Sequence, residues 1–292
     1  MGKGMLSVNS NYSSQFAAKA AKNTQALVDK SVERLSTGMR INSSRDDVAG
    51  QSIVIRLNAE IQSFTVRSKN AADGNSLLDT AEEGMQAIHA TLLRMRELAI
   101  QASNGTLEGS DRGALDAEAK ALESEITRIA NNTTWAGMGV MDGTRDYSGI
   151  YFEGHENNWQ LAIFHTIPPM TFSALGALML TAGTSGQIFS TGSGVDTFTN
   201  ARVYISSVDM ALSYVSGQRT DLAAVSNRID SFISNLSEVR TQLASSMGRI
   251  EDADFAVETG NLAKSQILQQ AATAMLAQAN TSKSSILALV QL

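Results

Sequence analysis

A heptad repeat in the C-terminal half of the chain constrains its fold more than any other feature. Between residues 208 and 250, hydrophobic side chains recur at alternating spacings of four and three. This pattern is typical of a long helix that packs along its length against other helices. The repeat positions are Val208, Leu212, Val215, Arg219, Leu222, Ser226, Ile229, Ile233, Leu236, Arg240, Leu243, Met247 and Ile250. The charged positions Arg219 and Arg240 either set the register between helices or extend to the edge of the contact, and the edge is the simpler expectation.

Two further repeats predict helices in the N-terminal half. The first runs through Leu57, Ile61, Phe64, Ser68, Ala71, Asn75 and Leu78, slips by one place, and resumes at Ala81, Met85, Ile88, Leu92, Met95 and Ala99. A turn signal at Asn104-Gly105 ends this helix, and the next repeat runs from Leu115 to Ile129. The chain has two prolines, and proline disrupts helix interiors. We therefore predict a mainly α fold of long, coiled-coil-like helices in an elongated bundle.

The segment from about 133 to 198 has a different character. Glycine, serine, threonine and aromatic residues dominate it, and short hydrophobic runs lie between turn signals, as at 150–152 and 161–164. Such runs predict short strands and hairpins. We expect a small, central β-hairpin region within an otherwise helical chain.

Both ends of the chain carry helical repeats with few large hydrophobic side chains. The predicted seam positions are Phe16, Leu27, Val28, Val32 and Leu35 near the N-terminus, and Leu268, Ala272, Met275, Ala279, Ile286 and Leu289 near the C-terminus. Burial of these side chains offsets only part of the entropy lost when both ends become ordered. Either the ends are disordered in the free monomer and fold on association, or they dock on the central helices. Identical ends that associate head-to-tail without closing would produce a helical filament, but spacing does not decide closure.

Composition excludes several classes of function. The chain has no cysteine, three histidines and a net charge of -6, so thiol catalysis, disulfides, cysteine-zinc sites and nucleic-acid binding are not expected. No run is long and hydrophobic enough for membrane insertion, and the first 30 residues lack the hydrophobic stretch of a cleaved signal peptide. No catalytic, metal-binding or phosphate-binding motif is present. We therefore expect neither an enzyme nor a cofactor.

Three segments together resemble the bacterial flagellin family. They are Leu35–Gly50, Leu93–Thr106, and the C-terminal pair Lys264–Ala271 and Leu276–Asn280. The resemblance covers about 1–145 and 200–292 and does not extend to about 146–198. It implies a structural subunit that self-assembles into the flagellar filament for motility. The alternatives are a hook–filament junction protein, or a surface helical module whose central segment binds a glycan or a receptor.

Membership of this family would also imply a domain organisation and a route of export. Residues 1–45 and 255–292 would form an inner assembly domain, and 46–254 an outer helical domain that contains the β-rich segment at about 133–198. The connector between them would include Arg40, Ile41, Asn42, Asp46 and Asp47. The subunit would be secreted by the flagellar export apparatus, without a cleaved signal peptide, to the extracellular flagellum. Its expected partners are other copies of itself, an export chaperone, the filament cap and the hook-junction proteins.

The resemblance further implies a surface that innate immune receptors of vertebrates recognise. The matching positions are Arg94, Leu98 and Glu118. The alternative is that Arg94 and Glu118 are ordinary solvated helix charges and that Leu98 is a packing residue.

Overall fold

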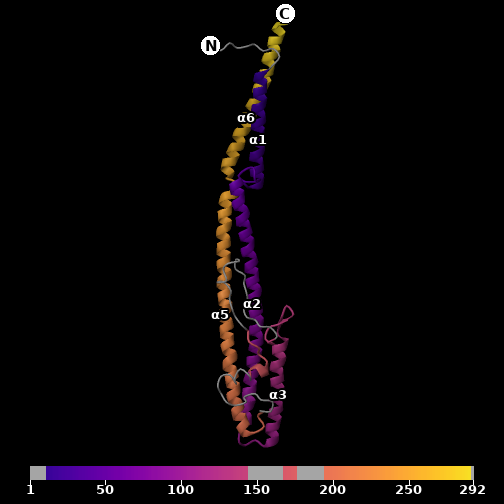
Figure 1. Cartoon of the computed structure of the whole chain (residues 1–292), viewed down its shortest axis with the longest axis vertical. Helices are drawn as coiled ribbons and strands as arrows, with labels where there is room; N and C mark the ends of the chain where they lie inside the picture. The colour runs from indigo at the N-terminus through magenta and orange to yellow at the C-terminus, as the bar shows by residue number, and fades with distance from the viewer. Residues whose placement is uncertain (1–10, 144–166, 176–193, 291–292) are drawn as a thin grey trace. The chain divides into compact units, whose positions relative to one another are not determined.

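Long helices dominate the computed structural model (Figure 1), which describes residues 11–143, 167–175 and 194–290, with only the backbone for 283–290. The helices are α1 (Tyr12–Thr37), α2 (Val48–Ala102), α3 (Gly109–Asn132), α5 (Phe198–Glu251) and α6 (Phe255–Val290). Strands β1 (Thr134–Trp135) and β2 (Met138–Gly139) form an antiparallel hairpin. The prediction of a mainly α fold with long helices and a small β-hairpin is confirmed. The predicted strands at 150–152 and 161–164 lie outside the described residues.

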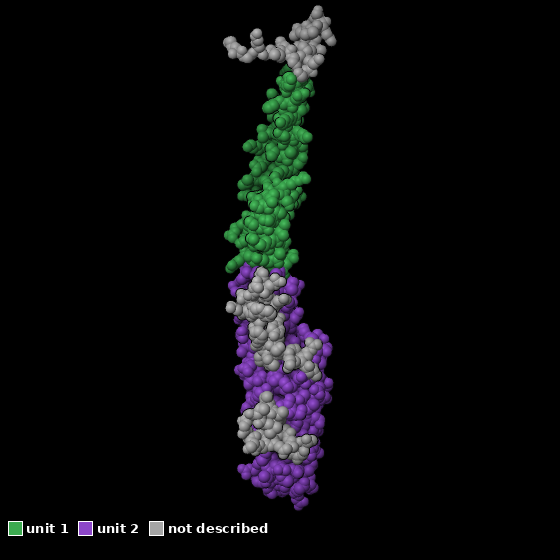
Figure 2. Space-filling view, viewed as in Figure 1, with its two compact units in different colours: residues 1–62, 240–292 green, residues 63–239 purple. Residues whose placement is uncertain are grey.

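The chain forms two compact units, each containing segments that are distant in sequence (Figure 2). Unit 1 comprises residues 1–62 and 240–292, and unit 2 comprises residues 63–239. Both boundaries fall within the long helices α2 and α5. The functional boundaries expected from the sequence, at residues 45 and 255, stay a prediction.

The core of unit 2 contains the heptad positions predicted from the sequence. In α2 the residues before and after the predicted slip are buried, including Leu78, Met85 and Leu92. In α5 the buried positions include Val208, Val215, Leu222, Ile229 and Leu236, each seven residues from the next. Helix α3 contributes Ala119, Ile126 and Ala130 to the same core. Helices α2, α3 and α5 therefore share one apolar core, as the heptad patterns predict.

A short segment within the predicted β-rich region also belongs to this core. Ile167, Met170 and Leu175 are all buried. The Met170 backbone N–H donates to the Met141 carbonyl at 2.9 Å. Farther along the chain, the Val195 backbone N–H donates to the Asp116 carboxylate at 2.8 Å. These bonds fix residues on either side of the central segment to the helical core.

The charged heptad positions of α5 differ from each other. Arg240 is exposed, as expected for an edge position. Arg219 is only partly exposed, and its guanidinium binds Glu82 of α2 at 2.6 Å, so this position forms an ion pair between two helices. The pairing has a physical reason, since a partly buried charge is costly unless it has an opposite charge beside it. One heptad away, Ser226 donates to Asn75 at 2.7 Å.

Candidate functional site

Helices α1 and α6 of unit 1 pack side by side through a seam of small and polar residues. The buried or half-buried residues of α6 recur at spacings of four and three: Glu258, Leu262, Ser265, Gln269, Ala272, Leu276 and Ala279. On α1 the buried residues are Ala17 and Ser31. Near the free ends, the Asn11 amide donates to the Ala279 carbonyl at 3.2 Å. This seam buries little large apolar surface, so it stabilises the pair only weakly.

The predicted seam residues divide between two faces of the helix pair. Val28, Leu35, Ala272 and Ala279 are half-buried. The larger side chains point elsewhere, with exposed fractions of 77% for Phe16, 52% for Leu27, 49% for Val32, 43% for Leu268 and 64% for Met275. The side chains of Ile286 and Leu289 lie outside the described residues. One α1–α6 pair therefore leaves a second apolar face that no other described residue covers.

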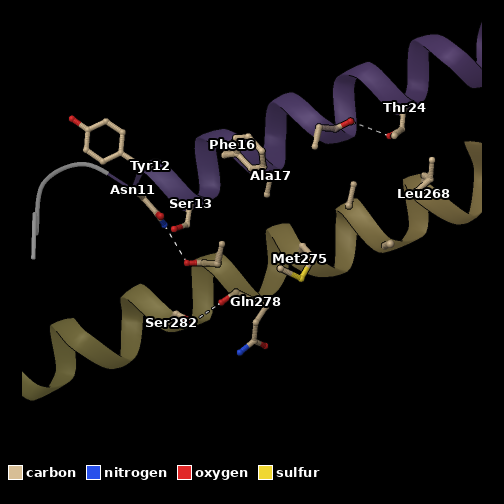
Figure 3. A pocket seen from close by; sticks show the side chains of 14 residues that line it. Asn11, Tyr12, Ser13, Phe16, Ala17, Thr24, Leu268, Met275, Gln278 and Ser282 are labelled. Atoms are coloured by element: carbon tan, nitrogen blue, oxygen red, sulfur yellow. Dashed lines mark hydrogen bonds between the residues drawn. The ribbon is translucent and has the colours of Figure 1, made fainter. Parts of the chain in front are cut away.

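An open groove of about 850 Å³ runs between the two helices near their free ends (Figure 3). It is lined by Asn11, Tyr12, Ser13, Phe16, Ala17, Ala20, Thr24, Leu268, Ala271, Ala272, Met275, Gln278, Ala279 and Ser282. The alanines leave space between the helices, whereas Phe16, Leu268 and Met275 supply large apolar walls. The arrangement suits the reception of apolar side chains from another helix.

The groove is uncharged on both sides. No charged residue lies between Lys3 and Lys19, and none lies between Lys264 and Lys283. A helix face that stays in water normally carries charged side chains. An apolar, uncharged surface on an exposed helix pair is typical of a protein–protein interface.

The connector between α1 and α2 is held by backbone bonds to the end of α5. Met39 pairs with Asp252 in an isolated antiparallel bridge. The Arg40 N–H donates to the Glu251 carbonyl at 2.6 Å, and the Ala253 N–H donates to the Gly38 carbonyl at 2.9 Å. Gly38 ends α1 at a φ of 73°, a left-handed conformation that favours glycine. The connector is therefore a defined joint within unit 1.

The other predicted connector residues stabilise this joint from within. Ile41 is 2% exposed. Asp46 accepts the backbone N–H groups of Asn42 and Ser43, each at 3.1 Å, and forms an ion pair with Lys30 at 2.8 Å. The hydrogen bond from Lys30, together with these backbone bonds, lowers the pKa of Asp46 to about 2. Asp47 accepts the N–H of Gly50 in the first turn of α2, at 2.9 Å.

A polar cluster that sequence reasoning missed lies at the joint end of the α1–α6 seam. The Ser31 hydroxyl donates to Glu258 at 2.6 Å, and Arg34 lies 3.5 Å from the same carboxylate. Glu258 is only 7% exposed. The sequence contains an indication of this cluster, because Glu258, Leu262 and Ser265 follow the same spacing of four and three as the rest of the α6 seam.

The predicted receptor surface lies on unit 2 and contains an ion pair. Arg94 binds Glu118 at 2.8 Å and also Glu97 at 3.1 Å. The neighbouring Leu98 is 1% exposed and belongs to the core. Recognition by innate receptors stays a prediction.

The described ranges lack two other kinds of feature, metal clusters and membrane-spanning helices. There, no cluster of three or more histidine, aspartate or glutamate side chains is placed to hold a metal ion. None of the helices in these ranges combines the length and hydrophobicity that crossing a membrane requires.

Comparison with known proteins identifies the family. Residues 8–146 match the model of the bacterial flagellin N-terminal helical region, and residues 205–290 match that of the C-terminal helical region. Flagellin A of Vibrio cholerae is 32% identical over an alignment that covers 98% of this chain and 100% of the relative. The chain belongs to the bacterial flagellin family. Flagellin FlaB2 of Treponema pallidum is likewise 32% identical, with 97% of this flagellin and 99% of the relative covered.

The similarity to solved structures concerns the fold alone. A structure described as a flagellar hook-associated protein from Vibrio parahaemolyticus superposes with a TM-score of 0.54 at 16% identity, covering 71% of this flagellin and all of that chain. Family membership confirms the predicted function as a structural, self-polymerising subunit of the extracellular flagellar filament. The junction-protein and glycan-binding alternatives are not supported.

Proposed function

We propose that this flagellin assembles by burying the groove and the exposed apolar faces of α1 and α6 against the same helices of neighbouring copies. The observation that carries the proposal is the uncharged groove, in which Phe16 and Met275 are largely exposed in the single chain. Burial of each such side chain contributes about 1.5–3 kcal/mol. Assembly supplies the apolar neighbours that the small-residue seam lacks.

We further propose that residues 1–45 and 255–292 form the inner part of the filament and that 46–254 form the outer part. The terminal helices have a thin seam and an unpartnered second face, so they become fully ordered only when neighbours cover them. The connector residues Arg40, Ile41, Asn42, Asp46 and Asp47 then join the two parts. Hydrogen exchange of monomer and filament tests this proposal, since the backbone of α1 and α6 should be protected only in the filament.

Export partners follow from the same surface. The uncharged, apolar stretch of α6 between Lys264 and Lys283 needs a cover before secretion, which favours an export chaperone that binds this helix. The cap and hook-junction proteins would meet the same helices at the ends of the filament. Export through the flagellar apparatus, without a cleaved signal, requires an unfolded chain, and the absence of disulfides suits this. Loss of chaperone binding on removal of 262–292 is the expected result of a binding assay.

Seeded elongation tests the proposed function directly. Purified subunits mixed with short filament fragments should add to the fragments and lengthen them, as seen by electron microscopy. Subunits that never lengthen the fragments, under conditions in which a known flagellin does, would contradict the proposal.

A charge placed in the groove should weaken assembly. Ala271 is exposed and lines the groove, so Ala271→Asp would bury an unpaired carboxylate when another copy docks. We expect the critical concentration for elongation to rise at least tenfold, about 1.4 kcal/mol. The matched control is Ala277→Asp, which alters an exposed alanine of the same helix outside the groove lining. Equal effects of the two changes would show that the groove has no special role.

The joint should lose stability in acid because of Asp46. Its folded pKa, about 2, lies below the ordinary 3.8, so its stabilising effect is complete above pH 4 and is lost as the pH falls through 2. Asp46→Asn should lower the dissociation temperature of filaments at pH 7. Between pH 4 and pH 2 this temperature should then fall less in the variant than in the unmodified filament. The control is Asp29→Asn, since Asp29 accepts a hydrogen bond from the Gln25 amide and forms no ion pair with any residue that the structure describes. An unchanged acid profile for Asp46→Asn would contradict the assignment.

A further inference from the structure

We propose that Met275 is an oxidation site that controls assembly. Conversion of its thioether to the sulfoxide by a peroxide-class oxidant in the free subunit blocks addition to the filament, and incorporation into the filament protects the sulfur. The inference rests on the proposed function, because it assigns regulation to the same groove.

Exposure distinguishes Met275 from the other methionines that the structure describes. Its side chain is 64% exposed and lies beside the groove (Figure 3). The methionines of unit 2 that are 0% exposed are Met85, Met95, Met141 and Met170. Those of intermediate exposure are Met39, Met138, Met210 and Met247. An oxidant in solution therefore reaches the sulfur of Met275 more readily than those of the buried set.

The chemistry needs only the thioether and the oxidant. Hydrogen peroxide transfers one oxygen atom to the sulfur: the O–O bond breaks, an S–O bond forms, and the remaining oxygen leaves as water. The sulfur is oxidised by two electrons and the peroxide is reduced by two. The chain contains no cysteine, so no thiol in the subunit competes for the oxidant. The product is a polar side chain in place of an apolar one.

Two hydroxyl groups that line the groove already donate their hydrogen atoms within the chain. The Thr24 hydroxyl already donates to the carbonyls of Ala20 and Ala21 in its own helix, at 3.1 and 2.9 Å. The Ser282 hydroxyl donates to the Gln278 carbonyl at 2.9 Å, and the Asn11 amide donates to α6. A sulfoxide oxygen covered by a neighbouring copy would therefore lose its hydrogen bonds to water, and neither hydroxyl would replace them.

The first measurement compares the rate of oxidation in two states of the same protein. Free subunits and filaments are exposed to hydrogen peroxide, and methionine sulfoxide is located by mass spectrometry of peptides. Met275 should oxidise at least about tenfold more slowly in filaments, since a covered sulfur reacts slowly. Met85, Met95, Met141 and Met170 should stay reduced in both states, as internal controls. Equal rates for Met275 in the two states would overturn the inference.

The second measurement uses seeded elongation. Subunits that carry sulfoxide at Met275 should elongate filaments at least about tenfold less efficiently than untreated subunits, which corresponds to the lost burial of one apolar group. Met275→Leu, which preserves volume and has no sulfur, should elongate normally before and after peroxide. Untreated Met275→Gln, a polar side chain of similar length, should reproduce the loss.

The outcomes separate this inference from the proposed function. Failure of untreated wild-type subunits to elongate would overturn the proposed function and the inference with it. Normal elongation by subunits with verified sulfoxide at Met275 would overturn the inference alone. An equal loss of elongation in peroxide-treated Met275→Leu would also overturn the inference alone, because another methionine would then be responsible.

Discussion

Removal of residues 262–292 is expected to abolish filament elongation while leaving unit 2 folded. The deletion takes away the α6 side of the groove, including Leu268 and Met275, and most of the seam that α1 contacts. The core of unit 2 is formed by α2, α3, α5 and the segment 167–175, none of which is removed. Seeded elongation should be undetectable by electron microscopy, and hydrogen exchange within 63–239 should match that of the full-length monomer.

The opposite result would revise the assembly argument. If the shortened chain loses protection throughout 63–239, the terminal helices belong to the monomer's own core, and the alternative of docked ends is correct. If it still elongates filaments, α6 does not form the interface. The Ala277→Asp variant of the full-length chain serves as the reference, because it alters α6 without deleting it.

Leu92→Ala should strongly lower the stability of unit 2. Leu92 is 0% exposed within the core formed by α2, α3 and α5. Truncation of such a leucine removes buried methyl groups and leaves a cavity, at a cost of about 2–5 kcal/mol. The measurement is the free energy of unfolding of the monomer from urea denaturation, compared with that of the unmodified chain.

The neighbouring residue provides a closely matched control. Leu93 is 44% exposed, so Leu93→Ala makes the same chemical change one position away. Its effect should stay within about 0.5 kcal/mol, as is usual for surface substitutions. Similar losses for the two variants would contradict the assignment of Leu92 to the core and of Leu93 to the surface.

The helical skeleton was predictable because periodicity reports burial directly. Positions such as Met85 and Leu92 in α2, or Val215 and Leu222 in α5, are buried where the heptad pattern predicts them. The slip between Leu78 and Ala81 in the predicted repeat is also reproduced, since both residues are buried. A long repeat places its apolar side chains on one face of the helix, and that face is buried only by packing against other helices.

The α1–α6 surface was less predictable because α6 carries two overlapping repeats. Leu268 and Met275 belong to one and are exposed, whereas Gln269 and Leu276 belong to the other and are half-buried. Sequence reasoning assigned the larger apolar side chains to the seam. In the structure, the contact between α1 and α6 uses the smaller and more polar side chains instead. A single sequence does not reveal which face contacts its own chain and which contacts another.

The core segment at 167–175 was missed for a different reason. Its two prolines and its glycine-rich surroundings resemble a surface loop, and nothing local reveals that Met170 reaches the helices. The contact depends on the Met141 carbonyl, nearly thirty positions earlier. Pairings of this range are set by tertiary structure rather than by local pattern.

The bonds at Met141 and Asp116 clamp the chain on both sides of its central segment. The entropy of closing a loop grows only with the logarithm of its length, by about 0.6 kcal/mol for each doubling. The chain on either side of the buried segment 167–175 can therefore change in length at little cost to the helical skeleton, provided that Met170 and Val195 keep their bonds. Those stretches can therefore vary while the buried frame around Ile167, Met170 and Leu175 is kept.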